Sequence, residues 1–281
     1  MDHIFQDPDT HLVKNVCERF VGSKISLNYQ IEFKDGRTHL HPFNNCNIVG
    51  DCLEDILYPY LKERISTFEK GPKQASPDFI NRNEYEWELK AFKASPSFDL
   101  SNFLSYIHQL STSGGVSRKI FKTQYIIFKY DIEDGKIMID NVYIKNVWDL
   151  VGYDKTYPVS LQCKKGSWYS IRPCSFMEMK SHGCKNKTHA LFVKKMCEAI
   201  RKCPNKVHNK NGMIMNIRRQ YDACLKQISL KSKKIIKGSK GVSKIPKSAT
   251  KRHISRRVQN QRVQSQMIHK PRTFRMQLRR R

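Results

Sequence analysis

The chain has 281 residues, of which 52 are Lys or Arg and 25 are Asp or Glu, so its formal net charge at pH 7 is +27. This charge predicts a polyanionic partner, most simply a nucleic acid. The length and a hydrophobic content of 39% allow one large or two small domains with a buried core, and no stretch approaches the roughly 18 apolar residues of a membrane span.

The first 110 residues alternate between helical and extended patterns. We expect a helix over 10–20, a strand over 26–33, irregular chain over 40–47, a helix over 50–64, a loop over 70–75, a strand over 84–91 and a helix over 98–110. The helix over 50–64 is the best supported. Its apolar residues recur at helical spacing, with Asp51 near its start and Lys62 near its end, as the helix dipole prefers.

The rest of the chain predicts hairpins, then helices, then a tail. We expect a loop over 111–117, paired strands over 123–132 and 136–144, a second pair over 159–163 and 167–172, and helices over 190–202 and 213–230. Residues 231–281 carry 18 Lys and Arg and no acid. We therefore expect one domain over 1–230 and a basic, disordered tail over 231–281.

Cysteine usage indicates a reducing compartment. The nine cysteines are odd in number and form no CxxC pair, so neither a disulfide framework nor a zinc ribbon is expected. The chain starts with acidic and polar residues, unlike a signal peptide. These features predict free thiols in a cytoplasmic protein.

The strand over 84–91 gathers charges on one face. Successive side chains of a strand point to opposite faces. One face would hold Glu84, Glu86, Glu88 and Lys90, and the other Tyr85, Trp87, Leu89 and Ala91. Like charges two residues apart on one face repel, whereas a divalent cation would turn this repulsion into attraction.

Pro77-Asp78 is followed ten residues later by Glu88-Leu89-Lys90. This order resembles the PD-(D/E)xK nuclease superfamily, which includes many type II restriction endonucleases. The resemblance implies that Asp78 and Glu88 ligate Mg²⁺ and that Lys90 orients or helps to deprotonate the attacking water. The residue types suit the chemistry, because Mg²⁺ prefers oxygen ligands and phosphodiester cleavage needs an activated water and charge neutralisation.

A second Pro-Asp, at positions 8 and 9, could pair with Glu32 and Lys34. We favour Asp78 because a helix precedes it, as in the family fold, whereas Asp9 lies where a helix cap is expected.

Two further acids remain open. Glu54, on the helix before Asp78, is either an additional metal ligand or a solvated helix residue. Glu86 shares the face of Glu88 and is either a substitute or second-metal ligand, or an exposed residue.

The second hairpin is the candidate DNA-recognition element. Its candidate DNA-contacting residues are Gln162, Lys164, Lys165, Trp168, Tyr169 and Arg172. Cationic side chains can read guanine edges and Gln can read adenine, although an ordinary amphipathic hairpin would look similar. The segment 111–119, with Gly114-Gly115 followed by Arg118 and Lys119, could clasp a phosphate.

The order of these features resembles the NgoBV-like group of restriction endonucleases. The resemblance implies an α/β (α+β) fold with a restriction-endonuclease-like core, in which helices flank a central mixed sheet. It also implies Mg²⁺-dependent cleavage of double-stranded DNA at a GGNNCC-type palindrome, leaving 5′-phosphate ends, and a companion methyltransferase. A homodimer is expected, because two active sites are needed to cut both strands of a palindrome.

Two alternatives stay open. One is a repair or recombination nuclease of the same superfamily, and the other is a non-catalytic nucleic-acid-binding protein. The basic tail is either an arm that adds DNA affinity by counterion release or the product of translation past a frame change.

Overall fold

The structure is a computed structural model, and it describes residues 7–26, 28–32, 36–42, 49–72, 75–153, 155–174 and 188–239. The chain divides into two compact units, Met1–Lys231 and Ser232–Arg281. No helix in the described part of the chain is long and apolar enough to cross a membrane.

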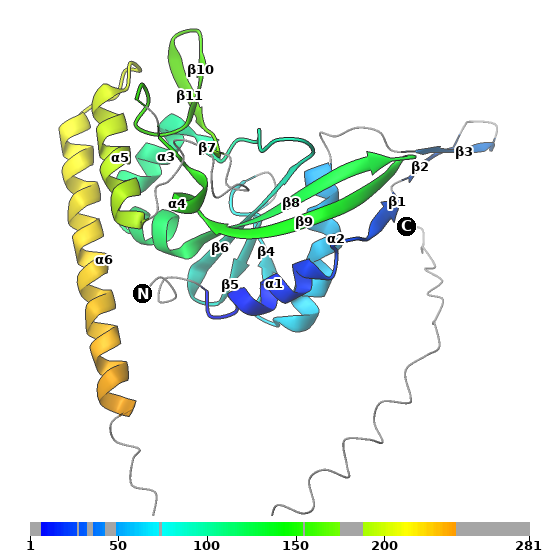
Figure 1. The fold of residues 1–281 in the computed structure, drawn as a ribbon, viewed down its shortest axis with the longest axis horizontal. Coiled ribbons are helices and arrows are strands. Elements are labelled where there is room, and N and C mark those ends of the chain that lie inside the picture. Colours follow the sequence, from blue (N-terminus) through cyan, green and yellow to red (C-terminus); the bar gives the residue numbers. More distant parts are fainter. Residues whose placement is uncertain are drawn as a thin grey trace, which may run out of the picture. The chain divides into compact units, whose positions relative to one another are not determined.

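The elements follow one another as shown in Figure 1. The helices are α1 (Thr10–Glu18), α2 (Val49–Arg64), α3 (Phe103–Ser111), α4 (Val147–Leu150), α5 (His189–Lys202) and α6 (Lys210–Ser239), with a 3₁₀ turn η3 (Arg82–Glu84) and a π-helical segment η4 (Ser117–Lys122). The strands are β1 (Lys24–Ser26), β2 (Asn28–Glu32), β3 (Thr38–Pro42), β4 (Glu69–Lys70), β5 (Phe79–Asn81), β6 (Tyr85–Phe92), β7 (Ser101–Asn102), β8 (Thr123–Glu133), β9 (Lys136–Asn146), β10 (Leu161–Lys164) and β11 (Ser167–Ile171).

A mixed sheet forms the centre of the first unit. Its strand order is β1-β9-β8-β6-β5-β4, in which β6 and β8 run parallel and the other neighbours run antiparallel. Two smaller sheets pair β10 and β7 with β11, and β2 with β3. Helices pack on both faces of the central sheet, which confirms the predicted fold class (Figure 1).

The two faces of β6 belong to two hydrophobic clusters. Trp87 and Leu89 pack with residues of α1, α2 and β8. On the other face, Glu88 lies beside Tyr125 and Lys90 beside Ile127, and these β8 side chains pack with α3, α5 and α6. The alternation predicted for this strand is therefore confirmed from Glu86 to Ala91.

Several predicted elements are confirmed, including the helix over 50–64 and both hairpins. Other expectations are wrong in part. Residues 40–42 belong to β3 rather than to irregular chain, and 43–47 lie outside the described residues. Residues 98–102 are not helical, because Ser101 and Asn102 form β7 and α3 begins at Phe103. The expected loop over 111–117 is partly helical because it leads into η4. Glu84 is not part of the strand, because it ends the 3₁₀ turn with φ of 63°.

The predicted boundary at residue 230 falls inside α6, which continues to Ser239. The division between the two units, after Lys231, lies one residue from the predicted boundary, and residues 240–281 lie outside the described part of the chain.

Candidate active site

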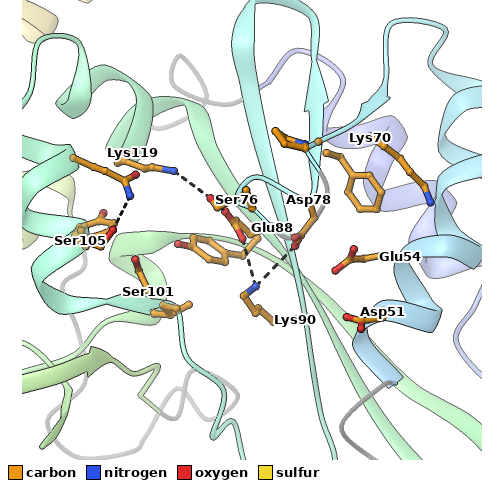
Figure 2. Close-up of a pocket in the computed structure, with 18 of the residues that line it drawn as sticks. Asp51, Glu54, Lys70, Ser76, Asp78, Glu88, Lys90, Ser101, Ser105 and Lys119 are labelled. Carbon is orange, nitrogen blue, oxygen red and sulfur yellow. Dashed lines mark hydrogen bonds and ion pairs between the residues drawn. The ribbon is translucent and has the colours of Figure 1, made fainter.

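A cleft of about 730 Å³ opens between α2, β6 and α3. Figure 2 shows Asp51 and Glu54 of α2 on one wall, Ser101, Ser105 and Lys119 on the other, and Asp78, Glu88 and Lys90 between them. Both walls are polar, and the floor is the charged face of β6. The cleft thus brings together all four of the predicted catalytic and metal-binding residues.

Asp78 is held at the start of β5 by the backbone around it. The amide of Leu89 donates to its Oδ2 at 2.6 Å, and the carbonyl of Asp78 accepts from Gly71 N at 2.8 Å. The two chains approach so closely that a Cβ on Gly71 would lie 1.7 Å from the carbonyl oxygen of Pro77. Glycine at position 71 therefore allows the chain that follows β4 to lie this close to Pro77-Asp78.

Glu88 and Lys90 point from β6 into the same cleft. Lys90 Nζ lies 3.4 Å from Glu88 Oε2 and 3.9 Å from Asp78 Oδ2, so one ammonium group contacts both carboxylates. The second oxygen of Glu88, Oε1, accepts a hydrogen bond from the Ser76 hydroxyl. Burial raises the pKa of Asp78 above its ordinary value; Lys90 opposes this rise and Glu88 adds to it.

Glu54 lies three residues after Asp51 on α2 and lines the same cleft as Asp78, Glu88 and Lys90. Burial, followed by the charges of Asp78 and Asp51, raises the pKa of Glu54 from 4.5 to about 7, and Lys90 opposes the rise. Glu54 is half-buried on the cleft wall and is not simply a solvated helix residue.

Glu86 is buried, not exposed. Its Oε2 accepts from Lys119 Nζ at 2.8 Å and from the Thr123 hydroxyl at 3.0 Å, and Arg118 Nε lies 3.6 Å from Oε1. Lys119 itself is only 7% exposed, and its ammonium group is paired with Glu86. No local sequence pattern indicates that Lys119 and Ser76 belong to the site, because their partners Glu86 and Glu88 lie 33 and 12 residues away in the sequence.

The β10–β11 hairpin presents some of its predicted DNA-contacting residues and buries another. Lys164 and Tyr169 are exposed, with Lys164 Nζ 3.6 Å from the centre of the Tyr169 ring, and Lys165 lies in the turn. Trp168 is instead 8% exposed and packs edge-on against Phe103 of α3, so it anchors the hairpin to the core.

The remaining two predicted DNA-contacting residues are linked to each other. Arg172 donates to Gln162 Oε1 at 2.8 Å, and its Nε lies 2.8 Å from Asp99. β11 pairs with β7 immediately before α3, so the hairpin is attached to one wall of the cleft.

The rival motif has a structural role. Asp9 lies at the start of α1, but its side chain makes no cap hydrogen bond. Its Oδ2 is 2.9 Å from Arg82 Nε and accepts from Asn81 at 3.1 Å, while Asp7 accepts from the indole of Trp87 at 3.0 Å. These acids fasten the N-terminal segment to β5 and β6, away from the cleft lining.

The sequence model of the NgoBV restriction endonuclease family matches residues 13–237, which include both the cleft and the hairpin. The chain belongs to this family. The type II restriction enzyme NlaIV of Neisseria lactamica is 30% identical over 157 residues, which are 53% of this chain and 63% of that enzyme. The alignment thus spans less than two thirds of the relative.

The solved NlaIV restriction endonuclease superposes with a TM-score of 0.64 at 22% identity, covering 77% of this chain and 89% of that one. This likeness confirms the restriction-endonuclease-like core. The match to the NgoBV family ends close to the last residue of α6, so the first turns of the predicted tail belong to the family-related part.

Restriction endonucleases generally use a divalent metal ion, and the donor set of the NgoBV-family cleft fits one. Asp78 and Glu88 offer carboxylate oxygens on either side of one ammonium group, and Glu54 adds a third carboxyl nearby. Within the described residues no group of three or more His, Cys, Asp or Glu side chains is already arranged to hold a metal ion.

Proposed function

We propose that this protein is a type II restriction endonuclease that cuts both strands of duplex DNA at a specific sequence, with Mg²⁺ as its cofactor. The observation that carries the proposal is the contact of the single Lys90 ammonium group with both Asp78 and Glu88 inside an open, polar cleft. Family membership supports the same class of reaction.

The residues of the cleft would have different roles in the reaction. Asp78 and Glu88, with Glu54, would hold Mg²⁺, which supplies positive charge against the phosphate as negative charge develops on it. Lys90 would position the attacking water or take part in its deprotonation. Attack on phosphorus in line with the leaving 3′-oxygen breaks the P–O3′ bond, and protonation of that oxygen leaves a 3′-hydroxyl and a 5′-phosphate.

The β10–β11 hairpin would read the DNA. Lys164, Lys165 and Tyr169 are exposed near the turn of the hairpin. Gln162 and Arg172, which are hydrogen-bonded to each other, lie at its open end. The pairing of β11 with β7 would hold these side chains at a fixed position relative to the cleft. We propose a GGNNCC-type palindrome as the target, a homodimer to cut both strands of it, and a methyltransferase that protects the host DNA.

The experiment is digestion of a defined plasmid by the purified wild type and by Glu88→Gln and Lys90→Ala. Discrete Mg²⁺-dependent bands are expected from the wild type, and a loss of at least about 100-fold in rate from each variant, since both groups act in the transition state. Equal cutting by the variants would refute the assignment of the site. If the wild type does not cut DNA with any divalent metal ion, the protein is a non-catalytic DNA-binding protein instead.

A further inference from the structure

Lys119 and Glu86 form a buried ion pair next to the catalytic residues. Lys119 lies in η4, and its Nζ is 2.8 Å from Glu86 Oε2. Both side chains are less than one tenth exposed. Since a buried ion pair is often no more stable than an apolar replacement, fold stability alone does not account for it.

A second contact links this pair to the catalytic carboxylates. Lys119 Nζ also lies 3.4 Å from Ser76 Oγ, and the Ser76 hydroxyl donates to Glu88 Oε1 (Figure 2). An ammonium group has no lone pair, so Lys119 can only donate, and Ser76 must accept from it. The single hydroxyl proton of Ser76 is then directed toward Glu88.

The direction of these bonds fixes the catalytic carboxylate. Glu88 Oε1 is occupied by Ser76, so Oε2 is the oxygen that faces Lys90, at 3.4 Å. Glu86 keeps Lys119 in place through the 2.8 Å contact. The chain of contacts from Glu86 to Glu88 therefore leaves one defined oxygen of Glu88 turned toward Lys90.

We propose that Lys119 is a positioning residue for DNA cleavage, which acts through Ser76 to orient Glu88 for metal binding. This inference rests on the proposed function, because the orientation of Glu88 matters only if the cleft binds a metal ion. It also assigns Glu86 a role as the counter-charge of Lys119 in place of a second metal ligand.

The test is a double-mutant cycle on the full chain with Lys119→Met, Ser76→Ala and the double variant. Mn²⁺ affinity of the DNA-free protein is measured by calorimetry, and kcat and KM by plasmid cleavage. Each single variant is expected to lower Mn²⁺ affinity and kcat by about tenfold, as for other residues that orient metal ligands, with an unchanged KM for DNA. The double variant should be no worse than the worse single variant, because both changes break one relay.

Two further variants serve as references. Lys119→Arg keeps a cation and its donors, so it should recover part of the affinity. Lys122→Met removes a lysine of the same η4 segment, whose Nζ is 3.4 Å from Glu84 and which does not line the cleft, so Mn²⁺ affinity and kcat should stay at the wild-type level.

Losses that add in the double variant would overturn the proposal, because Lys119 and Ser76 would then act independently. If Lys119→Met does not fold, Ser76→Ala decides alone, since it leaves the ion pair intact; unchanged Mn²⁺ affinity in that variant overturns the relay. Failure of the proposed function looks different, because the wild type would then cut no DNA with any divalent metal ion.

Discussion

Replacing Glu54 by Gln should stabilise the metal-free protein at alkaline pH. Burial and the neighbouring acids raise the pKa of Glu54 to about 7 in the folded protein, from 4.5 in the absence of these effects. A raised carboxyl pKa means that folding disfavours the charged form, so the cost is fully present above about pH 7 and fades as the pH falls toward 4.5. Glutamine carries no charge at any pH and removes this cost.

The size of the effect follows from the same shift. A change from 4.5 to about 7 sets an upper limit of roughly 3 kcal/mol at pH 8. Because Glu54 is only half-buried, solvent screening reduces this to about 1 kcal/mol. For a domain of this size, the melting temperature should rise by about 2–4 °C.

Thermal melts in EDTA at pH 8 and pH 5 measure this difference. Glu63→Gln is the matched control, because Glu63 is exposed near the end of the same helix and does not line the cleft. Glu54→Gln should melt above the wild type at pH 8, with most of the gap gone at pH 5, and Mg²⁺ at pH 8 should stabilise the wild type more than the variant. A variant that melts at or below the wild type at pH 8 would refute the view that the acids of the cleft repel one another without a metal ion.

Three other substitutions test the parts around the cleft. Gly71→Ala should destabilise the protein by about 1–3 kcal/mol and slow DNA cleavage, because the added Cβ would displace the carbonyl of Pro77. Gly50→Ala is the control, because a Cβ at that position meets nothing within 4 Å. Equal melting temperatures of the two variants would contradict the close approach at Gly71. Lys165→Asn should weaken DNA binding, and asparagine tolerates the positive φ of position 165. The slope of log affinity against log salt concentration should become shallower by about one, and an unchanged slope would argue against a phosphate contact. Trp168→Ala should cost about 3–5 kcal/mol of stability in unfolding titrations, and a loss of DNA affinity with no loss of stability would show that the ring faces DNA.

Local patterns in the sequence predicted the strand and helix that carry the candidate site. The period of two places Glu88 and Lys90 on one face of β6, and helical spacing places Glu54 on α2. The alternation fails at Glu84, because the chain enters β6 through a 3₁₀ turn that interrupts the pattern. Periodicity alone cannot show where a strand begins.

The long-range contacts were beyond the reach of such patterns. The sequence shows Lys119 in a Gly-containing, basic segment, which is typical of an exposed loop, but folding turns this side chain inward onto Glu86. Asp9 looks like a helix cap, but its side chain binds Asn81 on the central sheet and Arg82 next to it. Both cases depend on the sheet bringing distant segments together, which neighbouring residues do not reveal.

The most direct test of the account is a Mg²⁺-dependent digest of phage DNA followed by sequencing of the fragment ends, with Glu88→Ala in parallel. The account predicts discrete fragments with 5′-phosphate ends that all share one short palindrome, and none from the variant. Ends scattered over unrelated sequences, or the same fragments from Glu88→Ala, would contradict it.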